Sequence, residues 1–327
     1  MSILVFTLFL LVILGFLLRQ PIGKTQSFVS QFTGSGLTDH LGVVNFLILG
    51  IGGENHEGSD LTDSMIFTSL NTNTKNVTLV TIPRDVWVYS LRAKINTAYH
   101  YGFEKGATEG GILLAKSAVS EIINQPVDYV VILDFSTFES AIDLIGGVDI
   151  NIDRTFTDED YPIAGKETDL CNGDSKYRCR FEKLVFTQGL AHMDGVTALK
   201  FVRSRYSLDE IEGTDFGRSK RQEKVISAFI TKLLSPDTIR RPQKYLDLFN
   251  LFSKSLLTDL KPSQYFSLGK LLFKFRNSHP RTFSISQPGE LYNPPISPRH
   301  DNQWVLVPKG DNPRVIYDFV STALGTP

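Results

Sequence analysis

Residues 43–51 read VVNFLILGI, an unbroken apolar run that ends at a pair of glycines. A run of this length before a turn signal predicts a strand that is buried on both faces of a sheet. The runs SMIFTSL (64–70) and NVTLVTIP (76–83) predict two further strands, and the polar residues 71–75 between them predict a hairpin turn. The folded part of the chain is therefore expected to begin with neighbouring strands of one sheet.

The rest of the chain alternates between strand and helix patterns. Further strands are predicted at 128–135, 146–152, 284–288 and 303–308. Helices are predicted at 110–123, 138–145, 195–203, 216–234, 245–257 and 312–324. This alternation indicates an α/β fold, in which a central mixed β-sheet is flanked by helices.

The composition is that of a packed globular protein, because 42% of the 327 residues are hydrophobic and 21% are charged. The 34 Lys and Arg residues are balanced by 35 Asp and Glu residues. This balance argues against a general nucleic-acid-binding protein, which normally carries a basic excess. Two cysteines are too few for a disulfide-dense scaffold or a Cys-rich zinc module.

An uncharged apolar run occupies residues 3–18 and is closed by Arg19. No small-x-small cleavage pattern follows it, so we expect an uncleaved transmembrane signal-anchor over residues 1–19. The polar residues 20–42 are expected to form a linker or stalk, and residues 43–327 one domain. Basic residues follow the apolar run, which favours a cytoplasmic domain, but a longer basic start would reverse the orientation. The charges alone leave this question open.

The cysteines Cys171 and Cys179 lie in one polar stretch, DLCNGDSKYRCR. They could close a small disulfide loop in an oxidising compartment, or remain free thiols in a reducing one. The sequence leaves both alternatives open.

The motif IPRD at 82–85 places Arg84 and Asp85 directly after a predicted buried strand. Open α/β sheets bind ligands at the carboxyl ends of their strands. A guanidinium there can hold phosphate oxygens, and a carboxylate can hold a cation or accept a proton. The alternative is a surface ion pair at the end of a strand.

A glycine-rich acidic loop follows the first strand at 52–60. It lacks the Gly-Lys-Ser/Thr ending of a phosphate-binding P-loop. Its carboxylates and its histidine could bind a hard cation, or they could form an ordinary solvated loop.

A basic cluster lies in the stretch FVRSRYSLDEIEGTDFGRSKRQEK. Arg218, Arg221 and Gln222 have the i, i+3, i+4 spacing of one helical face, and Arg203 with Arg205 precede them. Such a set predicts a site for an anion with several charges, at a helix that begins after Thr214 or Asp215 as its N-cap. The alternative is an exposed basic helix start.

The motifs occur in an order that resembles the LytR-CpsA-Psr (LCP) family of bacterial cell-envelope phosphotransferases. They are LILG, LTDSM, VTLVTIPRDVWV, KINTAYHYG, VDYVVILDF, IDLIGGVDI, GLAHMDGVTALKFVRSR and GTDFGRSKRQ. The resemblance covers residues 45–225, and residues 226–327 are interpreted as its helical and strand continuation.

The resemblance implies a single-pass cell-membrane protein with an extracytoplasmic catalytic domain, which overrides the charge-based orientation. Members of the family transfer a glycopolymer from polyprenyl pyrophosphate to a peptidoglycan hydroxyl as a phosphodiester. Mg²⁺ bridges the pyrophosphate, and the lipid lies in an apolar tunnel. The implied partners are thus the lipid-linked glycopolymer, peptidoglycan and membrane lipid, and no nucleic acid.

Positions in this chain that match the family's motifs take roles from the resemblance. The catalytic residues are Arg84, Asp85, Arg203 and Arg205. The pyrophosphate-binding residues are Arg84, Lys94, Arg203, Arg205, Arg218, Arg221 and Gln222. The metal ligands are Asp63 and Asp85, and the structural or capping residues are Asn96 and Asp215.

The sequence departs from the family's pattern at two positions. Gly52 stands where many members have Asp, and Leu61 where many have Arg. We therefore expect substitute metal ligands, of which the candidates are Glu54, His56 and Asp60. Two other functions stay open, namely a polyprenyl-pyrophosphate hydrolase and a non-catalytic polyprenyl-phosphate-binding protein.

Overall fold

The computed structural model describes residues 36–53, 59–166, 168–233, 235–275, 278, 280–286 and 289–325. The predicted signal-anchor at 1–19 and most of the predicted stalk lie outside these residues. Within the described part of the chain, no helix has the length and apolar character needed to span a bilayer.

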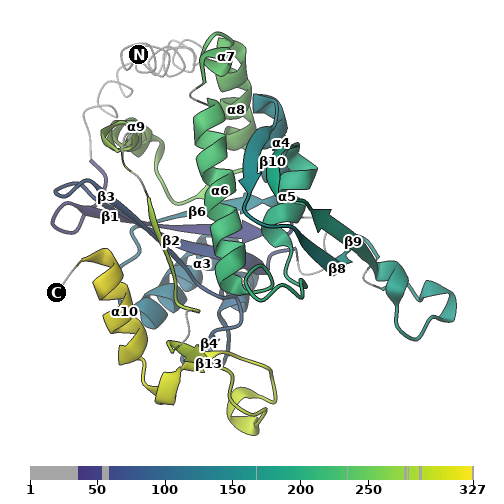
Figure 1. Cartoon of the computed structure of the whole chain (residues 1–327). Coiled ribbons are helices and arrows are strands. Elements are labelled where there is room, and N and C mark those ends of the chain that lie inside the picture. The colour runs from purple at the N-terminus through teal and green to yellow at the C-terminus, as the bar shows by residue number, and fades with distance from the viewer. Residues whose placement is uncertain are drawn as a thin grey trace.

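A six-stranded mixed sheet forms the centre of the fold (Figure 1). In spatial order its strands are β11 (Leu257–Thr258), β6 (Tyr129–Asp134), β1 (Val43–Ile51), β2 (Thr62–Asn71), β3 (Asn76–Thr81) and β12 (Arg281–Ser284). The pairs β1–β6 and β3–β12 are parallel, and the remaining neighbours are antiparallel. The predicted mixed sheet and the hairpin between β2 and β3 are confirmed.

Alternate residues of β1 supply two separate cores, because successive side chains of a strand point to opposite faces. Leu47 and Leu49 pack in a cluster with Ile112 of α3 (Ala98–Ile123) and Ile316 of α10 (Arg314–Leu324). Figure 1 shows both helices on the same side of the sheet. The sheet is therefore covered by helices on this face.

The opposite face of β1 packs against α9 (Tyr265–Lys274). Val44 and Phe46 lie in one buried cluster with Leu271 of α9 and with Phe275, which follows it. A strand buried on both faces explains why residues 43–51 show no polar alternation.

A third buried cluster lies beside the sheet. Its helices are α4 (Phe135–Ile145), α5 (Gly195–Arg203), α6 (Asp215–Leu233) and α8 (Pro242–Ser255), and the short α7 (Pro236–Ile239) connects α6 to α8. Its strands include β7 (Val148–Ile152) and β10 (Gly189–Met193), which pair antiparallel, and Phe156 and Phe186 also belong to it. This cluster fixes α5 and α6, the helices that carry the predicted basic residues.

A two-stranded arm leaves the body of the molecule and was not predicted. Its strands β8 (Phe156–Pro162) and β9 (Phe181–Phe186) pair antiparallel and project to one side (Figure 1). Cys171 and Cys179 form a disulfide in the loop that joins them, so the structure takes the first of the two alternatives. The sulfur atoms are consumed by this bond and cannot ligate a metal together with the nearby Asp169.

Some predicted boundaries were wrong. The helix expected at 110–123 already begins at Ala98, with a break in helical geometry at Gly106 and Ala107. The strand expected at 284–288 is β12, which ends at Ser284. The strand expected at 303–308 is reduced to β14 (Val307–Pro308), which pairs with β13 (Leu291–Tyr292).

Helix α5 begins against the backbone of α4 at Gly195. The Gly195 N–H donates to Asp143 Oδ1 at 2.7 Å, and a Cβ at this position would lie 2.3 Å from the carbonyl oxygen of Glu139. We expect Gly195→Ala to lower the free energy of unfolding by about 1–3 kcal/mol, because a methyl group must push α5 away from α4. Urea denaturation measures this change.

The adjacent Val196→Ala is the control, since Val196 is exposed on the same helix turn. Its unfolding free energy should remain within about 0.5 kcal/mol of wild type. Equal stabilities of the two variants would contradict the close approach at Gly195.

Candidate functional site

The site is organised around a pairing between the start of β2 and the end of β3. These strands are antiparallel, so Asp63 at the start of β2 lies near Arg84, which follows β3. The Nη1 atom of Arg84 donates to Asp63 Oδ1 at 2.8 Å, and its Nε lies 3.6 Å from Asp85 Oδ2. Burial lowers the pKa of Arg84, but the carboxylates of Asp63 and Asp85 outweigh it and raise the pKa above its ordinary value.

A short hairpin supplies the partner of the Asp85 carboxylate. It consists of β4 (Trp87–Val88) and β5 (Ala93–Lys94), and Lys94 Nζ donates to Asp85 Oδ1 at 2.8 Å. The next residue, Ile95, donates its N–H to the carbonyl of Val86 at 2.7 Å. The predicted metal ligand Asp85 is thus already paired with a cation.

Asn96 supports this segment, as its predicted structural role requires. Its N–H donates to the carbonyl of Arg84 at 3.2 Å, and its carbonyl accepts from Thr62 Oγ1 at 3.2 Å. The Asn96 Oδ1 atom is buried and has no hydrogen-bond partner within the described part of the chain. Asn96 therefore connects the start of β2 to the backbone of Arg84.

Helix α5 brings the second stretch of basic residues to the same carboxylate. Arg203, in the last turn of α5, places Nη2 3.7 Å from Asp63 Oδ2. Its guanidinium carbon lies 4.2 Å from the ring centroid of Phe135, a cation–π contact. Asp63, which was predicted to be a metal ligand, is therefore shared by Arg84 and Arg203.

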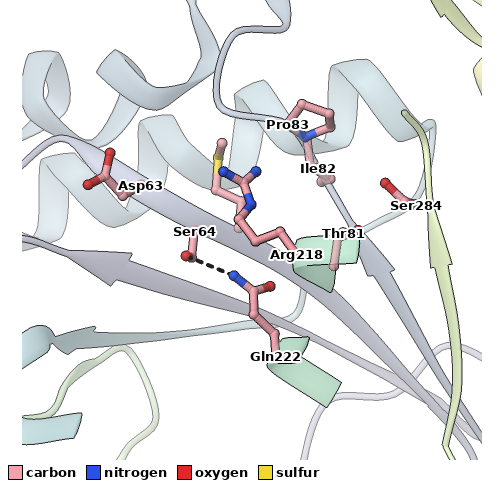
Figure 2. Close-up of a pocket in the computed structure, with 9 residues that line it drawn as sticks. Asp63, Ser64, Thr81, Ile82, Pro83, Arg218, Gln222 and Ser284 are labelled. Atoms are coloured by element: carbon pink, nitrogen blue, oxygen red, sulfur yellow. Dashed lines mark hydrogen bonds between the residues drawn. The ribbon is translucent and has the colours of Figure 1, made fainter. Parts of the chain in front are cut away.

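A small pocket adjoins this centre (Figure 2). Its lining residues are Asp63, Ser64, Met65, Thr81, Ile82, Pro83, Arg218, Gln222 and Ser284. Arg218 and Gln222 extend from α6 over the strand that carries Asp63, and Gln222 Nε2 donates to Ser64 Oγ at 3.4 Å. The cavity of about 10 Å³ has room for about one water molecule, so it is not the predicted lipid tunnel.

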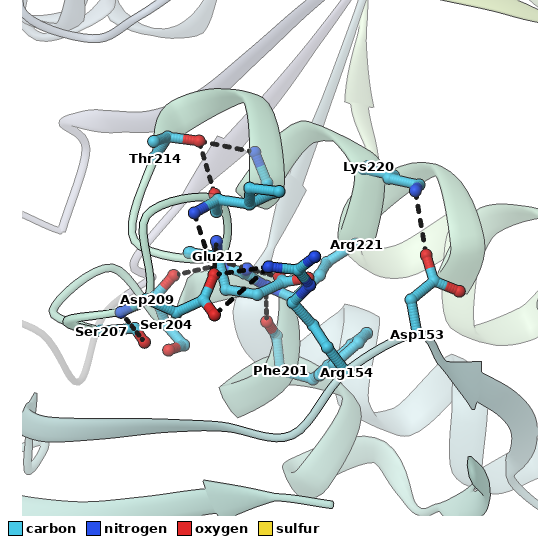
Figure 3. Close-up of polar contacts among 12 residues, drawn as sticks. Asp153, Arg154, Phe201, Ser204, Ser207, Asp209, Glu212, Thr214, Lys220 and Arg221 are labelled. Atoms are coloured by element: carbon cyan, nitrogen blue, oxygen red, sulfur yellow. Dashed lines mark hydrogen bonds and ion pairs between the residues drawn. The ribbon is translucent and has the colours of Figure 1, made fainter. Parts of the chain in front are cut away.

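Arg221 does not join Arg218 and Gln222 in this pocket, and the prediction that it does is wrong. Its side chain is buried, and Figure 3 shows it among polar partners of the protein. Nε donates to the carbonyl of Phe201 at 2.9 Å, Nη2 to that of Ser204 at 2.6 Å, and Nη1 to Glu212 Oε2 at 2.5 Å. Burial lowers the pKa of Arg221, and Glu212 opposes that effect. Arg221 is a structural cation.

A buried carboxylate that the sequence analysis missed fixes the turn after α5. Asp158 of β8 is completely buried, and its Oδ2 accepts from Ser204 Oγ at 2.7 Å, Arg205 N at 2.9 Å and Tyr206 N at 3.2 Å. Arg205 is half-buried, and its guanidinium makes no hydrogen bond or ion pair with the described residues. Nothing in the acidic stretch TDED distinguishes Asp158 from its neighbours.

The start of α6 is capped by Thr214 rather than by Asp215. Thr214 Oγ1 accepts from the N–H of Gly217 at 3.1 Å, and Asp215 is the first residue of the helix. The capping role predicted for Asp215 therefore belongs to its neighbour.

Of the candidate substitute metal ligands, Glu54 and His56 lie outside the described residues. Asp60 is described, and its Oδ2 lies 2.8 Å from Nδ1 of His100. This hydrogen bond is the largest cause of a raised pKa at His100. Asp60 is thus engaged with an imidazole that the sequence analysis did not assign to it.

The structure is that of an α/β protein in which arginines from separate parts of the chain gather at one end of the central sheet. Four cationic side chains, those of Arg84, Lys94, Arg203 and Arg218, meet two carboxylates there, so the net local charge is about +2. A model described as the LytR_cpsA_psr family matches residues 20–304, and the chain belongs to this family. The resemblance inferred from the motifs is confirmed.

Curated relatives include proteins named polyisoprenyl-teichoic acid–peptidoglycan teichoic acid transferase TagU. The protein of that name from Bacillus cereus is 28% identical over 251 residues, which is 76% of this chain and 69% of the relative. The one from Oceanobacillus iheyensis is 30% identical over 222 residues, which is 66% of this chain and 59% of the relative. The chain thus spans about 60 to 70% of the length of these relatives.

Solved structures share the fold. The protein gbs0355 from Streptococcus agalactiae has a TM-score of 0.60 at 21% identity, covering 87% of this chain and 89% of that one. TagT bound to LIIa-WTA has a TM-score of 0.55 at 23% identity, covering 87% and 91%. The central mixed sheet flanked by helices is therefore that of known LCP structures.

The buried ion pair of Arg221 with Glu212 is expected to be important for stability. Arg221→Met should lower the free energy of unfolding by about 3–5 kcal/mol, because it leaves the Glu212 carboxylate without its cation. Urea denaturation followed by circular dichroism measures this change.

The neighbouring Lys220→Met is the matched control. Lys220 Nζ pairs with Asp153 Oδ2 at 2.9 Å, but both side chains are exposed. Lys220→Met should therefore lower the free energy of unfolding by no more than about 1 kcal/mol. If both substitutions cost the same, the structural role of Arg221 is refuted.

The contact between His100 and Asp60 should make stability depend on pH. The raised pKa of His100 means that folding favours the imidazolium. Its stabilising contribution is fully present below the ordinary pKa of about 6.5 and is lost as the pH rises through the raised pKa. The difference in unfolding free energy between wild type and His100→Asn should shrink accordingly in urea titrations across that pH range.

The same comparison in an Asp60→Asn background is the control. There the hydrogen-bonding carboxylate is absent, so the effect of His100→Asn should vary much less with pH. A difference that persists unchanged at high pH in the wild-type background would count against the pairing.

Proposed function

We propose that this protein is a membrane-anchored phosphotransferase of the bacterial cell envelope. In this proposal it moves a glycopolymer from a polyprenyl pyrophosphate carrier to a hydroxyl of peptidoglycan, where a phosphodiester forms. The names of the TagU relatives support both the polyisoprenyl-linked donor and the peptidoglycan acceptor.

The observation that carries this proposal is the shared position of Arg84 and Arg203 on Asp63. Each arginine comes from a different part of the chain, and Arg218 reaches the same place from α6. A pyrophosphate diester has two negative charges, which the local net charge of about +2 complements. Guanidinium groups can also meet phosphate oxygens in a bidentate geometry.

The proposed reaction follows from these groups. The acceptor hydroxyl oxygen forms a bond to the phosphorus next to the sugar polymer, and the bond from that phosphorus to the bridging oxygen breaks. Arg84, Arg203 and Arg218 neutralise the charge that moves onto the leaving polyprenyl phosphate, while Gln222 donates a neutral hydrogen bond. Asp85 orients the acceptor hydroxyl and takes its proton, and Lys94 holds the Asp85 side chain in place.

The donor set suits the proposed Mg²⁺ cofactor. Magnesium is usually held by one or two carboxylates together with substrate phosphates and water. Asp63 would provide one carboxylate, and Asp85 would provide a second as the alternative to its role as proton acceptor. Asn96, whose buried Oδ1 has no hydrogen-bond partner among the described residues, contacts the residue before Asp63. Binding of the pyrophosphate by the arginines would leave Asp63 free to bind the ion. When bound, Mg²⁺ would neutralise phosphate charge.

The proposed location is the outer side of the cell membrane, with a single N-terminal span. The uncharged run at residues 3–18 supports the anchor. The disulfide between Cys171 and Cys179 supports an oxidising compartment for the domain.

An assay of polyprenyl phosphate release tests the catalytic assignment. Arg84→Ala and Arg203→Ala should each reduce the rate about a hundredfold, because a charge-assisted contact to the transition state is lost, on the order of 3 kcal/mol. Arg178→Ala, at the exposed tip of the arm, is the control and should act at the wild-type rate. Wild-type rates for both site variants would refute the assignment.

Product analysis with and without a peptidoglycan acceptor separates the transferase from its rivals. A transferase releases polyprenyl phosphate only in step with glycan attachment. A hydrolase releases it without acceptor, and a lipid-binding protein releases none under either condition.

A further inference from the structure

The two tryptophans of this chain have opposite environments. Trp87 is 1% exposed, whereas Trp304 is 48% exposed. An exposed indole ring is a large apolar surface with only one polar atom, and water is a poor environment for it.

The exposure of Trp304 is built into the fold, because the residues that follow it are firmly held. Val305 and Val307 form a buried cluster with Trp87. Between them, Leu306 donates its N–H to the carbonyl of Asp85 at 2.9 Å and accepts from the N–H of Trp87 at 2.9 Å. Because side chains alternate along an extended chain, a buried Val305 is preceded by an outward-facing residue 304.

This backbone pairing places Trp304 beside the candidate site. Lys94 Nζ lies 6.0 Å from the centroid of the indole ring and 2.8 Å from Asp85 Oδ1. The exposed indole ring of Trp304 thus lies next to Lys94 and close to Asp85, the carboxylate that accepts the proton of the acceptor hydroxyl in the proposed reaction. The other side of Arg84 faces Asp63, where Arg203 also binds.

We propose that Trp304 is a stacking platform for a sugar ring of the acceptor glycan. This inference rests on the proposed transferase function. A sugar ring offers one face of polarised C–H groups, which suits the negative face of an indole, and a rim of hydroxyl groups, which suits Lys94 and Asp85. The platform places the ring so that its hydroxyl group reaches Asp85.

The surroundings favour a sugar over an isoprenoid chain. The residues before Trp304 are Asp301, Asn302 and Gln303, and all are polar and exposed. Lys94 gives the indole a charged neighbour and the chain that leads to it is polar, whereas a lipid would need a continuous apolar surface. The arginines on the far side of Arg84 suit the donor's pyrophosphate, which leaves this side to the acceptor.

Tryptophan fluorescence tests the platform without relying on the transfer reaction. The full-length chain, in a detergent without a sugar head group, is titrated with a tetramer of β-1,4-linked N-acetylglucosamine. The emission should change saturably, because stacking covers the exposed Trp304 while the buried Trp87 stays unchanged. In Trp304→Phe the emission change should vanish.

Calorimetry of the same titration measures affinity in the variants. Trp304→Phe keeps an aromatic face and should bind the tetramer within about threefold of wild type, and Trp304→Ala should bind about tenfold more weakly. Tyr265→Ala, at the exposed start of α9, is the control for loss of a surface aromatic residue and should bind like wild type. An unchanged emission, or full affinity in Trp304→Ala, overturns the platform.

Transfer kinetics then identify the sugar. If Trp304 holds the acceptor, Trp304→Ala should raise the KM for peptidoglycan glycan about tenfold and leave the KM for the polyprenyl pyrophosphate donor unchanged. A raised KM for the donor alone would assign the ring to the donor's sugar and overturn the proposal. If no variant transfers, the proposed function fails, and the fluorescence and calorimetry still decide whether Trp304 binds a sugar.

Discussion

One carboxylate, that of Asp63, holds together two guanidinium groups that repel each other. Arg84 approaches it at 2.8 Å and Arg203 at 3.7 Å, so the anion offsets the repulsion between them. The start of β2, the end of β3 and the last turn of α5 must all be in place for this contact to exist. In the proposed reaction, an arriving diphosphate would therefore meet cations that are already gathered, and the protein would not have to assemble them during the reaction.

Beneath this centre, buried charges keep the backbone in position. Asp158 receives hydrogen bonds from the turn after α5, and Arg221 binds the carbonyl groups of Phe201 and Ser204 in the same region. Each of these buried side chains makes several hydrogen bonds, which offset the cost of removing its polar atoms from water. The arginines of the site are thus supported by two buried charged side chains, those of Asp158 and Arg221, which do not line the pocket.

Much of the central sheet was predictable from local patterns, because a short apolar run such as residues 43–51 is compatible with few structures other than a buried strand. The arm was not predictable, because β8 (FTDEDYP) is mostly polar and contains no apolar run that would mark a strand. Sequence spacing also misplaced Arg221. On a helix it lies about 60° to one side of Arg218, and Gln222 lies about 40° to the other, so the two need not face the same neighbour.

The residues of the site also divide into those that a local sequence pattern locates and those that only tertiary packing places. Residues that follow a buried strand, such as Arg84, could be located from the strand pattern alone. The pairing of Arg221 with Glu212, and the burial of Asp158, depend on how distant segments pack, and no local pattern reveals them.

The base and the tip of the arm differ in their contacts with the rest of the protein. Asp158 at the base is tied into the turn that carries Arg205, whereas the tip beyond Pro162 is closed on itself by the disulfide. Insertions, deletions or a grafted loop at the tip would therefore leave the geometry of the arginines intact. Because of this separation, mutation or protein engineering could change the length of the arm and the molecules that its tip contacts without moving the arginines of the site.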